Sequence, residues 1–201
     1  MGFLKKWTSC ILSFIAGVLA LAMSACTGMI VSGSADLSAL GMSAQTIDKT
    51  TKAFKVLTDA SLYADAKNAG IGKEFMTMKV FAIITLVVAV LLIVYSIIML
   101  LKNLNVIKSN SIVFNIIGWS LVALFLIATI GLLVTSNTYA NLAIELTKAE
   151  LLSKGIPAQY VPTLPIEVTG KVGVYQPFML ATSIILAVAT TVFAVIKRKD
   201  A

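Results

Sequence analysis

The chain has 201 residues, of which 59% are hydrophobic and 12% are charged, and its mean hydropathy is +0.97. Soluble domains carry about 25% charged residues, so this composition excludes an ordinary soluble fold and indicates an integral membrane protein. The net charge is +7; the excess cations lie where apolar stretches end instead of clustering with aromatic or polar partners, so we expect no nucleic acid among the partners.

Four apolar stretches are about as long as the ~20 residues that a helix needs to cross a bilayer. They predict transmembrane helices over residues 7–31, 80–101, 112–135 and 178–196. The remaining segments are an N-terminus at 1–6, outer loops at 32–79 and 136–177, a short link at 102–111 and a tail at 197–201. The predicted fold is an all-α integral membrane protein built on a bundle of four transmembrane helices.

Positive charge is concentrated in the short segments of this plan. The N-terminus, the 102–111 link and the tail together carry +6, whereas the loops 32–79 and 136–177 carry +1 and 0. Short cytoplasmic segments are enriched in Lys and Arg. We therefore expect a multi-pass protein of the cell membrane with both termini and the link in the cytoplasm.

The first apolar stretch has a second interpretation. Two lysines at positions 5 and 6 precede it, and the tetrapeptide MSAC, which ends at Cys26, resembles the bacterial lipobox. This resemblance implies removal of residues 1–25, lipidation of Cys26 and three remaining transmembrane helices. However, the apolar run before Cys26 exceeds the roughly 7–15 residues of a signal sequence. We favour an uncleaved helix and keep the lipoprotein as the alternative.

Small residues recur every four positions along the first and fourth stretches. They are Ser9, Ser13 and Gly17, then Ala16, Ala20, Ser24 and Gly28, and in the fourth stretch Ser183, Ala187 and Thr191. This spacing lets membrane helices approach closely. We expect these faces to pack helices together, the fourth against the first.

The outer loop 32–79 has a helical period. In segment 36–68 apolar residues follow one stripe and charged residues the other side, which predicts an amphipathic helix. Ile47, Phe54 and Leu62 on that stripe are the candidate partner-binding face. The alternative is that this helix folds onto the ends of the spans or lies on lipid headgroups.

The loop 136–177 begins with a continuation of the third helix. This extension is expected to end near Gly155, where Gly and the following Pro157 stop a helix. Residues 166–175 then favour a small β-hairpin about Gly170 and Lys171.

Signatures of catalysis are absent from the sequence. There is no His, and the two cysteines both lie in the first stretch. On a helix Cys10 and Cys26 would be about 24 Å apart, too far for a disulfide. The phosphate-binding and serine-hydrolase motifs are missing, and no charge lies in the middle of a span, which argues against a pump or coupled transporter. We expect no catalytic, cofactor-binding or metal-binding residues, no cofactor, and no enzyme.

These features together predict a non-catalytic tetraspan protein of the envelope or of an assembly. Its partners would be the lipid bilayer and, through the outer loops, another membrane or extracellular protein or a second copy of the chain in a homo-oligomer. A rival hypothesis is an oligomeric channel or small-solute pore, in which Ser9, Ser13 and Ser24 face water. The lipoprotein anchored at Cys26 is the other alternative.

Overall fold

The computed structural model describes residues 2–35, 45–107, 111–153 and 166–199. In chain order its elements are α1 (Gly2–Met23), β1 (Thr27–Ala35), β2 (Gln45–Lys52), α2 (Ala53–Thr58), α3 (Ala60–Asn68), α4 (Gly72–Asn103), α5 (Ser111–Ser153), β3 (Ile166–Val172) and α6 (Tyr175–Lys199).

Three of the helices contain segments long and apolar enough to cross a membrane. These segments are Gly72–Asn103 in α4, Ile112–Glu145 in α5 and Tyr175–Val192 in α6. In α1 the apolar part, Cys10–Met23, is shorter. A backbone in hydrocarbon must satisfy its own hydrogen bonds, and a helix does so within one segment. The chain is therefore a multi-pass helical membrane protein that sits in a lipid bilayer.

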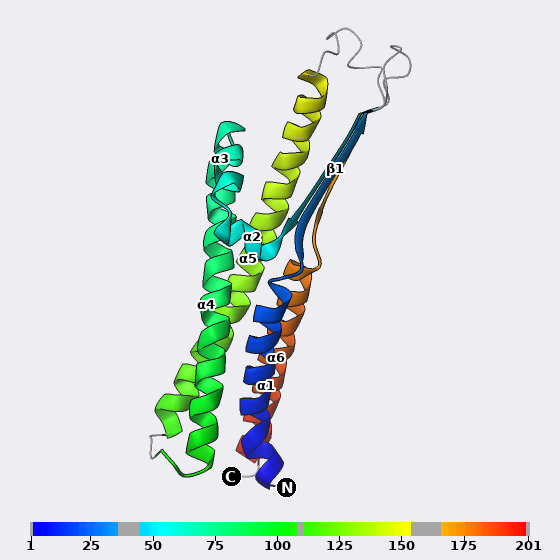
Figure 1. Cartoon of the computed structure of the whole chain (residues 1–201). Coiled ribbons are helices and arrows are strands. Elements are labelled where there is room, and N and C mark those ends of the chain that lie inside the picture. The colour runs from blue at the N-terminus through cyan, green and yellow to red at the C-terminus, as the bar shows by residue number, and fades with distance from the viewer. Residues whose placement is uncertain (1, 36–44, 108–110, 154–165, 200–201) are drawn as a thin grey trace.

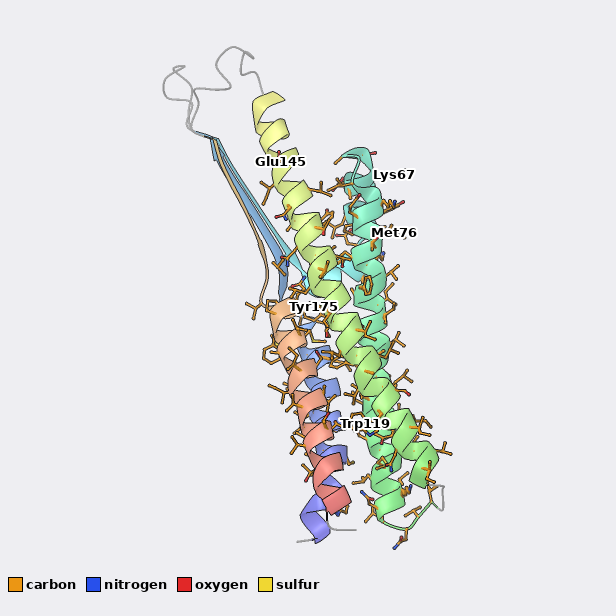
Figure 2. The ribbon with its side chains drawn as sticks, turned by 180° about the vertical axis from the view of Figure 1, so that it is seen from behind. Lys67, Met76, Trp119, Glu145 and Tyr175 are labelled. Atoms are coloured by element: carbon orange, nitrogen blue, oxygen red, sulfur yellow. The ribbon has the colours of Figure 1, made fainter. Side chains whose placement is uncertain are left out.

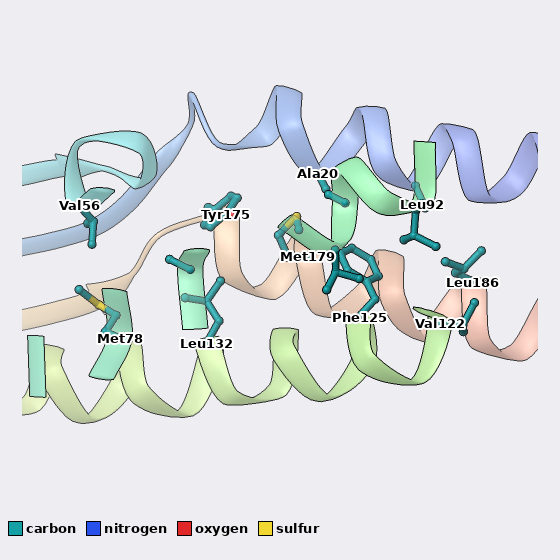
Figure 3. Packing of buried hydrophobic residues seen from close by; sticks show 14 of the residues in the cluster. Ala20, Val56, Met78, Leu92, Val122, Phe125, Leu132, Tyr175, Met179 and Leu186 are labelled. Carbon is teal, nitrogen blue, oxygen red and sulfur yellow. The ribbon is translucent and has the colours of Figure 1, made fainter. Parts of the chain in front are cut away.

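The four long helices form a bundle (Figure 1). α1 packs against α4 and α6, and α5 also packs against both of them. The expected contact between the first and fourth apolar stretches is thus present. Side chains from all four helices meet in the interior, where Ala20, Leu92, Phe125 and Met179 are buried (Figure 3). The predicted helical bundle is present, and the strands lie outside it.

The bundle has two different ends. Figure 1 shows the N-terminus, the C-terminus and the connection from α4 to α5 at one end. The strands, α2 and α3 lie toward the other end, where α5 extends well past the start of α6 (Figure 1). The described parts of the basic short segments and of the longer loops are therefore separated along the bundle axis.

The strands form a three-stranded antiparallel sheet with the order β2-β1-β3. Ser32 of β1 pairs with Asp48 of β2 on one side and with Thr169 of β3 on the other. Two predictions are wrong here. Residues 45–52 are a strand and not part of an amphipathic helix, and residues 166–172 are one strand instead of a hairpin, with Gly170 paired to Val31. Long-range pairing with β1 overrides the local pattern.

The first helix ends earlier than expected. α1 stops at Met23, and Thr27–Ala35 is extended, so the predicted helix over 7–31 is wrong for its last residues. The apolar residues that follow Met23 belong to β1, because a short apolar run fits a strand as well as it fits a helix.

Two short helices connect the sheet to α4. Asp59 caps α3: its Oδ1 accepts hydrogen bonds from the Ser61 backbone N–H at 3.0 Å and from the Ser61 hydroxyl at 2.6 Å. These hydrogen bonds lower the pKa of Asp59, because they favour the carboxylate. After α3, Gly70 has a φ of 82°, a conformation that glycine adopts without strain. The chain then reverses, and α3 packs along α4.

Candidate functional site

The helices α1 and α4 approach each other closely at Gly17. A Cβ on this residue would lie 2.6 Å from Ile93 Cγ1 and 2.7 Å from the carbonyl oxygen of Ala89. Ala16 and Ala20 on the same helix are buried, with 4% and 0% of their surfaces exposed. Only a residue without a side chain fits between these two backbones.

Polar groups of α1 also face inward at this contact. Ser13 is 2% exposed, and the Cys10 thiol donates a hydrogen bond to the carbonyl oxygen of Ser96 at 2.9 Å. The side chain of Ser9 lies outside the described residues.

The second small-residue stripe does not continue past the end of the helix. Ser24 lies after α1, and its hydroxyl donates to the Leu21 carbonyl at 2.6 Å. Gly28 is in β1, where its carbonyl accepts a hydrogen bond from the Gly173 N–H at 2.9 Å. Ser24 and Gly28 are therefore not on the helical face that carries Ala16 and Ala20, and Ser13 and Ser24 do not share one helical face.

The stripe on α6 turns gradually from the interior to the surface. Ser183 is fully buried, Ala187 is half-buried and Thr191 is exposed. The Thr191 hydroxyl donates to the Ala187 carbonyl of its own helix at 2.8 Å. Of these three residues, Ser183 makes the polar contact with a neighbouring helix.

Two further glycines, both on α5, permit close packing and were not singled out from the sequence. A Cβ at Gly118 would collide with the ring and hydroxyl of Tyr95, and a Cβ at Gly131 would collide with the ring of Phe81. Glycine inside a helix costs about 0.5–1 kcal/mol relative to alanine. A glycine that is kept inside a predicted transmembrane helix despite this cost indicates close packing at that position. This was the feature of the sequence that could have identified both glycines.

Between α5 and α6 lies a second set of buried polar side chains, which we call the α5–α6 polar seam: Thr129, Ser136, Gln176 and Ser183. The hydroxyls of Thr129 and Ser183 are 2.8 Å apart. The Gln176 amide Nε2 donates to the Ser136 Oγ at 3.3 Å. These groups form cross-helix hydrogen bonds without an acid or a base.

The candidate partner face is divided among three elements. Ile47 lies on β2, Phe54 on α2 and Leu62 on α3. Leu62 is half-buried and packs against the hydrophobic core, while the side chains of Ile47 and Phe54 lie outside the described part of the chain. The three residues therefore do not form one stripe of one helix.

Aromatic rings tie the outer helices together. The ring centroids of Tyr63 and Phe75 are 6.2 Å apart, and those of Phe75 and Tyr139 are 5.5 Å apart in an edge-on geometry. These contacts link α3, α4 and α5 beyond the start of α6; Figure 2 shows Glu145 of α5 far past the level of Tyr175. The projecting part of α5 is thus braced at its base.

Cys26 lies in the turn between α1 and β1. It is half-buried, and its Sγ is 3.7 Å from the Met23 Sδ. In the described segments, no group of three Asp, Glu, Cys or His side chains could hold a metal ion. No protein-family model and no curated protein matches the chain.

Proposed function

We propose that the chain is a non-catalytic, four-span protein of the cell membrane whose outer layer contacts another membrane or extracellular protein. The observation that carries this proposal is the continuous helix α5, which runs from the bilayer segment to Ser153. A helix that leaves the bilayer and is braced by neighbouring elements presents a fixed surface outside the membrane.

The length and surface of α1 support a fourth span. The uncharged part of α1 runs from Trp7 to Met23. At 1.5 Å per residue it extends over about 26 Å, close to the thickness of a hydrocarbon core. Ile11, Phe14 and Val18 are between 42% and 50% exposed on the outside of the bundle. Such an apolar surface is stable when it faces lipid.

Exposed apolar side chains form a belt around the other three helices. The belt extends from Met76 to Ile97 on α4, from Ile112 to Val134 on α5, and from Ile184 to Val192 on α6. On α4 it covers about 32 Å at 1.5 Å per residue. The belt matches one bilayer thickness, which leaves α3 and the far part of α5 outside the lipid.

The interior of the bundle supports a non-catalytic role. Among the side chains whose exposure the structure describes, no Asp, Glu, Lys or Arg is buried. Proton relays and ion-coupled transporters need ionisable groups within the membrane. The buried hydroxyls and the Gln176 amide serve packing and cross-helix hydrogen bonds instead.

Site-specific photocross-linking in intact cells tests the partner proposal. A photoreactive residue is placed at Asn141, which is exposed on the projecting part of α5, and in a matched variant at Ile127, which is 62% exposed on the lipid-facing belt. We expect one discrete protein adduct from Asn141 and lipid adducts from Ile127. Absence of a protein adduct from Asn141 contradicts the proposal. Self-adducts from both positions, with conductance in reconstituted bilayers, would favour an oligomeric pore.

Cysteine labelling tests the orientation. In a chain with Cys10 and Cys26 replaced by alanine, we expect cysteine at Ser61 to react with an impermeant reagent on intact cells and cysteine at Val106 to react only after permeabilisation. Both positions are exposed, so access depends on the side of the membrane. The short basic segments are expected in the cytoplasm. Reaction at Val106 alone in intact cells would reverse the orientation.

A further inference from the structure

Gln176 is the one described side chain in the protein with a buried polar atom that lacks a hydrogen-bond partner. The residue is 4% exposed, and its Oε1 has no partner among the described residues. Its Nε2 donates to the Oγ of Ser136, which is 1% exposed, at 3.3 Å. Buried polar atoms in native proteins almost always have a partner. The Oε1 atom therefore indicates a hydrogen-bond donor that the chain does not supply.

Rotation of the amide does not remove the unpaired atom. Exchange of Oε1 and Nε2, which are hard to distinguish in structures, would place the oxygen near the Ser136 hydroxyl and leave the two N–H donors of Nε2 without an acceptor. The amide needs partners at both atoms in either orientation, because the residue is 4% exposed and the position now held by Oε1 is buried. One serine hydroxyl cannot satisfy both.

The Ser136 hydroxyl is itself incompletely used. Two buried hydroxyls of α4 donate to carbonyls of their own helix: Ser96 donates to Leu92 at 2.7 Å, and Thr85 donates to Phe81 at 2.8 Å. Among the described residues, the Ser136 Oγ has the contact with Gln176 and no bond to a carbonyl of α5. In that contact the oxygen accepts, so the hydroxyl proton remains available as a donor.

We propose that the outer end of the α5–α6 polar seam binds one water molecule between Ser136 and Gln176. The water accepts the Ser136 hydroxyl proton and donates to the Gln176 Oε1, which closes a ring with the direct hydrogen bond from Nε2. A buried water commonly makes about 2–4 such bonds. Both protein groups are neutral, so they match a neutral donor and acceptor and not an ion.

The deeper half of the seam explains why the water is bound at one place. The Thr129 and Ser183 hydroxyls are 2.8 Å apart, and each also lies within hydrogen-bonding distance of a carbonyl of its own helix. These groups satisfy one another without a third molecule. The two polar contacts of the seam thus differ in whether their hydrogen bonds are complete. The complete pair, Thr129–Ser183, is the matched control for the incomplete pair, Ser136–Gln176.

The test uses the full chain in lipid bilayers with glutamine labelled in its side-chain amide. The sequence has three glutamines, Gln45, Gln159 and Gln176, and Gln176→Met identifies the signal of interest. We expect magnetisation transfer from a long-lived water to the Gln176 amide, and a carbonyl stretch at the lower frequency of a hydrogen-bonded group. Ser136→Ala is expected to abolish the transfer and raise the carbonyl frequency, whereas Ser183→Ala leaves both unchanged.

Each other outcome overturns the proposal. A wild-type Gln176 carbonyl stretch at the frequency of an unbonded amide, or no transfer from water, shows that no water is bound there. If magnetisation transfer from water to the Gln176 amide is unchanged in Ser136→Ala, the water does not bind between Ser136 and Gln176. If Ser136→Ala does not fold, Ser136→Thr, which retains a hydroxyl, must keep the water signal, and the two wild-type measurements still decide the proposal.

Discussion

Replacing Gly17 by leucine is expected to lower the stability of the bundle in detergent by about 1–3 kcal/mol, the usual cost of overpacking a tight contact. The Cβ of any substituted residue would lie 2.7 Å from the Ala89 carbonyl oxygen. This atom belongs to the backbone of α4, so a change of side-chain rotamer cannot relieve the contact. The two helices must move apart, and the buried surfaces of Ala16 and Ala20 lose their contacts.

Two control variants separate this effect from a general change in α1. Gly17→Ala adds only the Cβ, and we expect its stability to lie between that of the wild type and that of Gly17→Leu. Val18→Leu changes the neighbouring residue, which is 42% exposed, and is expected to leave stability unchanged because its side chain points out of the bundle. Thermal unfolding in a mild detergent measures all three. A Gly17→Leu protein as stable as the wild type would show that α1 does not pack on α4 as described.

The second prediction concerns the mass of the mature protein and the effect of replacing Cys26. If α1 is a permanent span, the mature protein contains residues 1–25, carries no diacylglycerol on Cys26, and tolerates Cys26→Ala with unchanged membrane insertion. Cys26 is half-buried in the turn after α1, and the hydrogen bond described for its Sγ is a weak one to the Met23 sulfur at 3.7 Å, so the loss of the thiol removes little. Intact-mass spectrometry of the purified protein measures the outcome.

The lipoprotein alternative predicts a different mass, that of a shortened and lipidated chain. Cleavage before Cys26 would remove α1 and add a lipid to the new N-terminus, and Cys26→Ala would block both steps. A mature species that begins at a lipidated Cys26 would leave three spans. Gly17→Leu would then have no effect on the folded protein, because a removed signal segment contributes nothing to it. The two experiments therefore support or contradict the fourth span independently.

The membrane helices could be predicted from the sequence because their cause is local. Long uncharged runs cover much of α4, α5 and α6, and a chain in hydrocarbon must form backbone hydrogen bonds within the same segment. The extension of α5 beyond the bilayer followed from its continuing helical pattern up to the Gly155 stop signal, and the helix is continuous to Ser153. The repeat of small residues around Gly17 also predicted a helix-packing face, and Gly17 lies against α4.

Contacts between distant residues could not be predicted in the same way. The sheet joins Ser32 to Asp48 and to Thr169, and nothing in residues 166–172 alone distinguishes one strand beside β1 from a hairpin. The same pairing ends α1 at Met23, because the apolar residues beyond it enter a strand. The spacing of apolar residues predicts secondary structure poorly where a distant strand supplies the hydrogen bonds.

The interior contacts were decided only by how the helices face one another. Helical spacing marks Ser183 as a small residue, but the tertiary structure determines that it meets Thr129 while Gln176 meets Ser136. Likewise Gly118 and Gly131 lie in an apolar run without a repeated spacing, and their role appears only when Tyr95 and Phe81 of α4 fill the space beside them. Apolar length determines that a helix enters the membrane; the rotation of each helix about its own axis, set by close packing with its neighbours, determines which of its residues meet.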